Sequence, residues 1–131
     1  MRRVIAVPPS LADELGRVVA KLRTTPESRL GASVSGPYSS RAAAGRALAS
    51  ALALAAQGIE DAGAPAMPEW RPLPALADLA VGDQVNVVAH DFLAALLGAP
   101  SVVWTPVGRA PVAELLRDVM AAVRDAARFL L

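Results

Sequence analysis

The chain has 131 residues, no cysteine and a formal net charge of +1. This length is typical of one domain, so we expect a single helical domain over residues 1–131. The absence of cysteine excludes disulfides and thiolate metal sites, which predicts a reducing, cytoplasmic location. The near-neutral charge argues against nucleic acid as the main partner.

The composition is apolar for a soluble domain, with 54% hydrophobic and 19% charged residues. A core this small leaves apolar helix faces uncovered, so we expect the chain to associate with itself or with another protein. The apolar stretch at residues 4–7 is too short for a signal core. The run at residues 47–56 is too short to span a membrane, so we expect no membrane association.

The first predicted helix starts at Ser10 and ends before Thr25-Pro26. Ser10 and Asp13 resemble a capping pair at its start. One stripe of this helix has the spacing of a buried face and comprises Leu11, Leu15, Val18, Val19 and Leu22.

A loop is predicted over residues 26–37, followed by an alanine-rich helix that Ser39 or Ser40 caps and that runs to about Ala62. Gly63 is expected to end it in a left-handed conformation. Its apolar ridge comprises Leu48, Leu52, Ala55 and Ile59, and a second face carries Arg46, Ser50, Gln57 and Asp61. The small alanines predict close packing by neighbouring helices.

Residues 64–74 contain four prolines, which predicts a stiff, extended connector across the surface. An extended segment of this length covers about 30 Å, so the next helix can begin at either end of the domain. Trp70 and Leu73 are expected to pack against helices.

A third helix is predicted over residues 75–97, with a kink or break at Gly82 and an end at Gly98. Residues 102–104 form an extended piece that could pair with residues 4–7. Pro111 then opens a last helix, whose apolar stripe suits either an intramolecular groove or a dimer contact. These elements predict an all-α, four-helix bundle-like domain with a proline-rich connector and, at most, one short two-stranded pairing.

The polar residues Asp83, Asn86 and His90 share one face of the third helix. A metal site there would need more ligands than one histidine and its neighbours supply, so we predict no metal. These side chains either face solvent or bond to an adjacent arginine. If the face is buried, Asp83 or Asp91 requires an arginine such as Arg41, Arg46 or Arg71.

A second candidate is an anion site at Ser39, Ser40 and Arg41, where a helix N-terminus presents free N–H groups. The glycine spacing matches no phosphate-binding motif, and ordinary capping, which explains both serines, is the favoured interpretation. No catalytic serine motif accompanies His90.

The sequence therefore predicts a non-catalytic, protein-interaction domain without a cofactor, acting as a homodimer or as an accessory subunit of another protein. The alternative is a small-ligand or anion-binding domain with a pocket between helices. Trp70, Trp104 or Phe92 would line that pocket, with His90 or Asp83 orienting the ligand.

Overall fold

The computed structural model describes residues 7–131, and most of them are helical. The elements in chain order are α1 (Pro9–Thr24), α2 (Glu27–Leu30), α3 (Arg41–Glu60), the 3-10 turn η1 (Asp78–Ala80), α4 (Val81–Leu97), β1 (Val102–Thr105), β2 (Gly108–Pro111) and α5 (Val112–Leu130). The predicted helical class is confirmed in its main feature, and the single two-stranded sheet is within the one short pairing that the prediction allowed.

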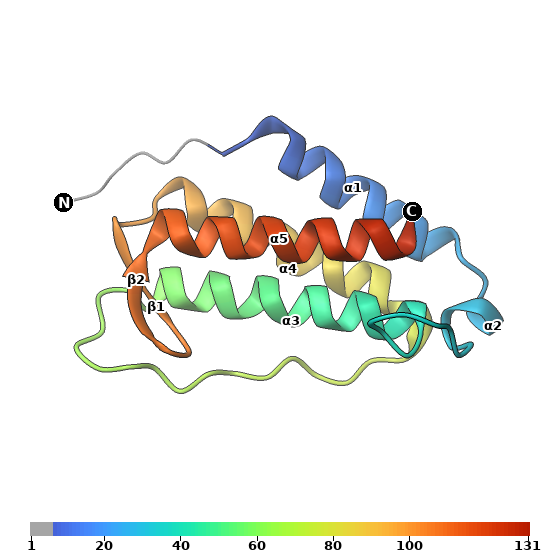
Figure 1. The fold of residues 1–131 in the computed structure, drawn as a ribbon. Helices are drawn as coiled ribbons and strands as arrows, with labels where there is room; N and C mark the ends of the chain where they lie inside the picture. The colour runs from blue at the N-terminus through green and yellow to red at the C-terminus, as the bar shows by residue number, and fades with distance from the viewer. Residues whose placement is uncertain (1–6) are drawn as a thin grey trace.

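Four long helices surround the core (Figure 1). Helices α1 and α5 run in one direction, and α3 and α4 run in the other. Helix α3 packs against α4 and α5, while α1 packs against the same two helices from the opposite side. The predicted stripe of α1 and the predicted ridge of α3 are both buried, and the apolar stripe of α5 faces inward.

The proline-rich connector runs the length of the molecule beside α3 (Figure 1). Helices α3 and α4 are parallel and follow one another in the chain. The chain must therefore return to the end of the molecule where α3 begins before α4 can start. Leu73 packs against the core on the way, as predicted.

Glycine makes two close helix approaches possible at the start of α4. A Cβ on Gly45 of α3 would lie 2.5 Å from Cγ1 of Val81, and one on Gly82 would lie 3.0 Å from Cγ of Arg23. The first distance is too short for a Cβ and the second is tighter than ordinary van der Waals contact, so α4 begins in direct contact with α1 and α3.

Several predicted helix ends are wrong. Helix α1 begins at Pro9 with no side-chain cap, so the Ser10 and Asp13 pair does not form. Helix α3 ends at Glu60, and Gly63 has no positive φ. A short helix, α2, interrupts the predicted loop, because Pro26 provides a favourable start and its C=O accepts the Leu30 N–H at 3.0 Å.

The third predicted helix starts later than expected. Residues 75–77 are not helical, and α4 begins at Val81 after η1. Gly82 therefore lies in the first turn of α4 rather than at a kink, and its role is the close approach to α1.

Strand β1 pairs antiparallel with β2, from Val102 opposite Pro111 to Thr105 opposite Gly108. The predicted partner, residues 4–7, lies outside the described residues except for Val7, which is not in a strand. The turn uses Gly108 at φ +126°, a conformation that favours glycine.

Helix α3 has the length and hydropathy of a membrane-crossing helix. Its most apolar 18-residue window is, however, 61% buried by the other elements, as in the core helix of a soluble protein.

Candidate functional site

The outward face of α4 carries a row of side chains at spacings of four, three, four and three residues. The row runs Asp83, Val87, His90, Ala94 and Leu97, and all five are exposed or half-exposed. Val87 is 58% exposed and Leu97 is 78% exposed. This is the spacing of a coiled-coil contact, and we call Val87, His90, Ala94 and Leu97 the α4 seam.

Asp83 is paired at the N-terminal end of this seam. Its Oδ1 accepts a hydrogen bond from Arg23 Nε at 2.7 Å, which joins the first turn of α4 to the end of α1. Both side chains are largely exposed, so the pair contributes little to stability but neutralises the carboxylate.

The arginines expected near this face bind elsewhere. Arg46 donates to Asp78 at 2.6 Å and to the Leu76 carbonyl at 2.9 Å, which anchors the end of the connector. Arg71 lies 3.8 Å from Asp61. The periodicity of α4 alone does not identify Arg23 as the partner of Asp83, because Arg23 belongs to α1 and precedes Asp83 by 60 residues.

The remaining predicted residues of the polar face do not converge. Asn86 is half-buried and His90 is exposed. Within residues 7–131, His90 has no hydrogen-bond or ion-pair partner, and no three potential metal ligands gather in one place. The structure therefore brings together Asp83 and Arg23, but not Asp83 and His90.

The residues of the predicted anion site cap helix α3 and make contacts within the loop before it. Ser40 Oγ accepts the Ala43 N–H at 3.0 Å, which makes it the N-cap of α3. Arg41 Nη1 donates to the Arg29 carbonyl at 3.2 Å, and the Ser39 carbonyl accepts from Val34 at 3.1 Å. Capping accounts for Ser40 and a loop contact accounts for Arg41.

The connector is fastened to α3 by Gln57, which is only 4% exposed. Gln57 Nε2 donates to the Glu69 carbonyl at 2.7 Å, and Gln57 Oε1 accepts the Arg71 N–H at 3.0 Å. The polar face of α3 that contains Gln57 therefore lies partly under the connector.

Two cavities flank the connector where Arg71, Pro72 and Leu73 cross α3. The first, of about 340 Å³, is completed by Ser50, Ala53, Leu54 and Trp70. The second, of about 350 Å³, reaches α4 and carries Gln57, Glu60 and Asp91 beside apolar side chains.

A smaller apolar cavity of about 140 Å³ lies between α3, α5 and the hairpin, with Trp104 in its wall. Trp70 and Trp104 thus line separate cavities, while Phe92 is fully buried in the core. His90 and Asp83 line neither of these two cavities, so they do not orient a ligand beside either tryptophan.

Comparison with known proteins adds nothing to this description: no family model, no curated protein and no solved structure matches the chain. The seam and the cavities are therefore the features from which a function can be inferred.

The sequence alone does not reveal three important contacts. In the sequence, Gln57 is one of several residues on a polar helix face, and Trp70 is an aromatic residue in a loop that could pack anywhere on the helices. Arg109 is a single charge with no evident partner. Arg109 in fact lies 4.1 Å from the centre of the Trp104 ring and donates to the Ala62 and Ala64 carbonyls. The positive charge of Arg109, close to the predicted extended piece, is the one feature of the sequence that could have suggested this contact. Basic side chains commonly bond to the carbonyls at the C-terminal end of a helix.

Proposed function

We propose that the protein is a non-catalytic interaction module that self-associates through the α4 seam. The observation that carries this proposal is an exposed four-three spacing of Val87, His90, Ala94 and Leu97 on a helix whose opposite face is buried. Apolar side chains in such a row are used to pack against another helix.

A second copy of the chain is the partner that this surface fits best. In an antiparallel pair, Val87 of each copy lies opposite Leu97 of the other, and His90 lies opposite Ala94. At the centre of this pair the large His90 side chain faces the small Ala94 side chain. The two helix dipoles are antiparallel, which is a favourable arrangement. A parallel pair would instead place His90 against His90 and Asp83 against Asp83.

Charge does not prevent this contact. Asp83 is neutralised by Arg23 within each copy, and Asp91 lies to one side of the seam. The long helices form the rigid support, which we interpret as a four-helix bundle with one crossover connection, α3 to α4. The lack of cysteine accords with a reducing, cytoplasmic setting.

We expect no catalytic activity of its own. Within residues 7–131, the only histidine has no carboxylate or hydroxyl partner, so the usual acid-base arrangement is not assembled.

The test is the molar mass in solution at micromolar concentration, measured by size-exclusion chromatography with light scattering. The wild-type chain is expected to be a dimer, and Leu97→Asp is expected to weaken the dimer more than tenfold, because it places a charge opposite an apolar side chain. Val107→Asp is the matched control, since Val107 is 96% exposed on the hairpin turn and outside the seam. A monomeric wild-type chain, or equal effects of both variants, would refute the proposal.

A further inference from the structure

The α4 seam contains one titratable side chain, His90, and Asp91 follows it on the helix. Both side chains are exposed, and within residues 7–131 neither has a hydrogen-bond or ion-pair partner. His90 is the only histidine of the chain, which also has no cysteine. Histidine is the side chain whose ordinary charge change falls between about pH 5 and 8, so the seam contains the one side chain expected to respond to pH in this range.

The proposed antiparallel pair would bring two copies of these side chains together. In this pair, His90 of one copy lies opposite Ala94 of the other. Residues three and four apart are neighbours on a helix surface, so Ala94 is flanked by Asp91 and His90 of its own copy. Each His90 would therefore lie beside Asp91 of the other copy, and two histidines and two aspartates would meet at the centre of the contact.

This cluster would carry two negative charges when both histidines are neutral and no net charge when both are protonated, since aspartate stays ionised in this pH range. From this arrangement we infer that uptake of a proton by His90 tightens the contact between copies, an inference that rests on the self-association proposed above. A group that binds its proton more tightly in the dimer than in the monomer stabilises the dimer as the pH falls and loses that effect as the pH rises.

Other charged groups on the elements that pack against α4 do not replace the proton. They are Arg23, which is held by Asp83, the exposed Asp13 and Arg17 four residues apart on α1, and Glu60 and Arg71, which line one cavity with Asp91. The guanidinium of Arg71 is already shared by Glu60 at 4.0 Å and Asp61 at 3.8 Å. None of these groups is recorded in a bond to His90 or Asp91 within residues 7–131.

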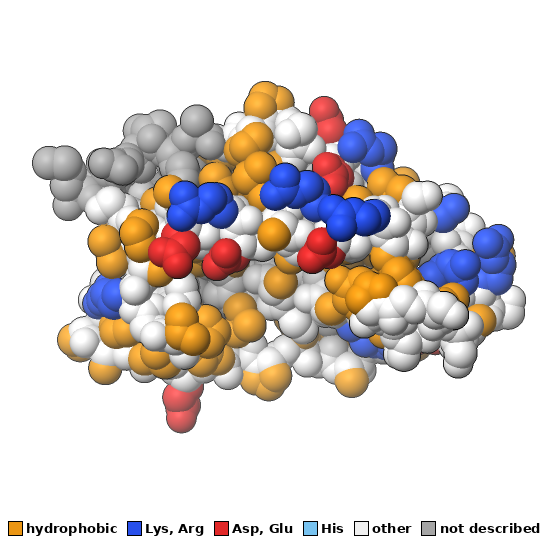
Figure 2. All heavy atoms as spheres, viewed as in Figure 1, with side chains coloured by type: hydrophobic (Ala, Val, Ile, Leu, Met, Phe, Trp, Pro, Cys, Tyr) orange, Lys and Arg blue, Asp and Glu red, His pale blue; other side chains and the backbone are white. Residues whose placement is uncertain are grey.

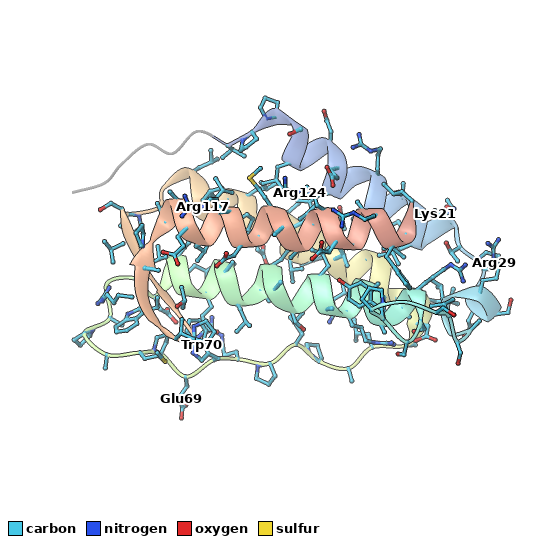
Figure 3. All side chains as sticks on the ribbon, in the orientation of Figure 1. Lys21, Arg29, Glu69, Trp70, Arg117 and Arg124 are labelled. Carbon is cyan, nitrogen blue, oxygen red and sulfur yellow. The ribbon has the colours of Figure 1, made fainter. Side chains whose placement is uncertain are left out.

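The charged rows of α5 lie away from the seam. Helices α4 and α5 both pack against α1 and α3, on opposite sides of them. Figure 3 shows Arg117 and Arg124 along α5, which lies in front of α4 in this view. Charges on α5 therefore serve as controls for effects of pH that do not arise in the seam.

Sedimentation equilibrium of the full chain at low salt tests the inference through the dimer dissociation constant at about pH 7.5 and 5.5. We expect the wild-type dimer to be about fivefold tighter at the lower pH, because two exposed charge pairs form. His90→Gln keeps a polar side chain without a titratable group and should bind equally at both values. A wild-type dimer that ignores pH, or one that weakens on acidification as facing histidines of a parallel pair would, overturns the inference.

Asp91→Asn separates pairing with this carboxylate from a general effect of pH. Without the carboxylate, a proton on His90 gains no partner and adds only repulsion between copies, so this dimer should weaken on acidification. Asp118→Asn is the matched control, an exposed carboxylate on α5 whose loss should leave the wild-type response intact. An Asp91→Asn dimer that still tightens on acidification would overturn the inference alone. A wild-type chain that is monomeric at both values would refute self-association, and this inference with it.

Discussion

The side-chain oxygen of Gln57 accepts a hydrogen bond from the main-chain N–H of Arg71 at 3.0 Å, while its amide nitrogen donates to the carbonyl of Glu69. One buried side chain thus satisfies two backbone groups of a segment that has no secondary structure of its own. This contact fixes the path by which the chain returns from the end of α3 to the start of α4.

Gln57→Leu should therefore destabilise the protein by about 1–3 kcal/mol, because it leaves the Arg71 N–H and the Glu69 carbonyl unpaired near the core. Urea unfolding followed by circular dichroism measures this. Gln84→Leu is the control, since Gln84 makes a single bond to the Pro74 carbonyl at the exposed end of the same connector. Equal losses for the two variants would show that Gln57 has no special role.

The contact between α3 and the hairpin depends on Gly58. A Cβ at this position would overlap with the Trp104 carbonyl oxygen, so Gly58→Ala must displace β1 and should cost about 1–3 kcal/mol. Gly16→Ala is the opposite case, because Gly16 lies in α1 and a Cβ added to it would have nothing within 4 Å. That variant should gain about 0.5–1 kcal/mol through helix propensity. Thermal unfolding of both variants should give shifts of opposite sign.

Arg109 and Trp104 together bond to the main chain just beyond the C-terminal end of α3. The guanidinium lies over the indole ring, and both side chains donate to the Ala64 carbonyl. A double-mutant cycle with Arg109→Met and Trp104→Phe should show a coupling free energy of about 0.5–1 kcal/mol. Additive effects in chemical denaturation would mean that the two side chains act independently.

The proposed antiparallel pairing of the α4 seam predicts a specific effect of Asp91. Near the middle of such a pair, Asp91 of each copy would lie beside Asp91 of the other, so these exposed charges would repel weakly. Asp91→Asn should tighten the dimer a fewfold at low salt, and added salt should do the same for the wild-type chain. Sedimentation equilibrium measures both. In a parallel pair Asp91 would face Asn86, and the substitution would leave the dimer unchanged.

Helix α5 is a poorer candidate than α4 for the proposed contact between copies. Its outward face carries charged side chains, with Arg117 and Arg124 on one side and Asp118 and Asp125 on the other. Figure 2 shows a basic row above an acidic row along the molecule. Within residues 112–130 no large apolar side chain is fully exposed, so this face suits solvent.

Local periodicity was enough to predict the four long helices, though not α2 or every helix end. The stripe from Leu11 to Leu22 and the ridge from Leu48 to Ile59 are buried because their spacing leaves one face apolar. The proline content of the connector likewise predicted an extended path. The first strand of the hairpin was predicted as an extended piece, but its partner β2 was missed, although Thr105-Pro-Val-Gly108 has the proline and glycine positions of a tight turn.

The contacts around the candidate site could not be predicted in the same way, because they join distant parts of the chain. Arg23 meets Asp83 only because α4 begins where α1 ends, and Gln57 is buried only because the connector returns along α3. Neither fact follows from the pattern of one helix. The four-three row on α4 was visible in the sequence, but its exposure depended on which side of the helix faced the core.

Self-association through α4 is tested most directly by disulfide cross-linking, since the chain has no cysteine of its own. Chains with Val87→Cys and differently tagged chains with Leu97→Cys are mixed and oxidised, with Val107→Cys as the control. We expect a cross-link between V87C and L97C chains and none with V107C chains. If V87C and L97C chains form no cross-link above the V107C background, the α4 seam is not where two copies meet.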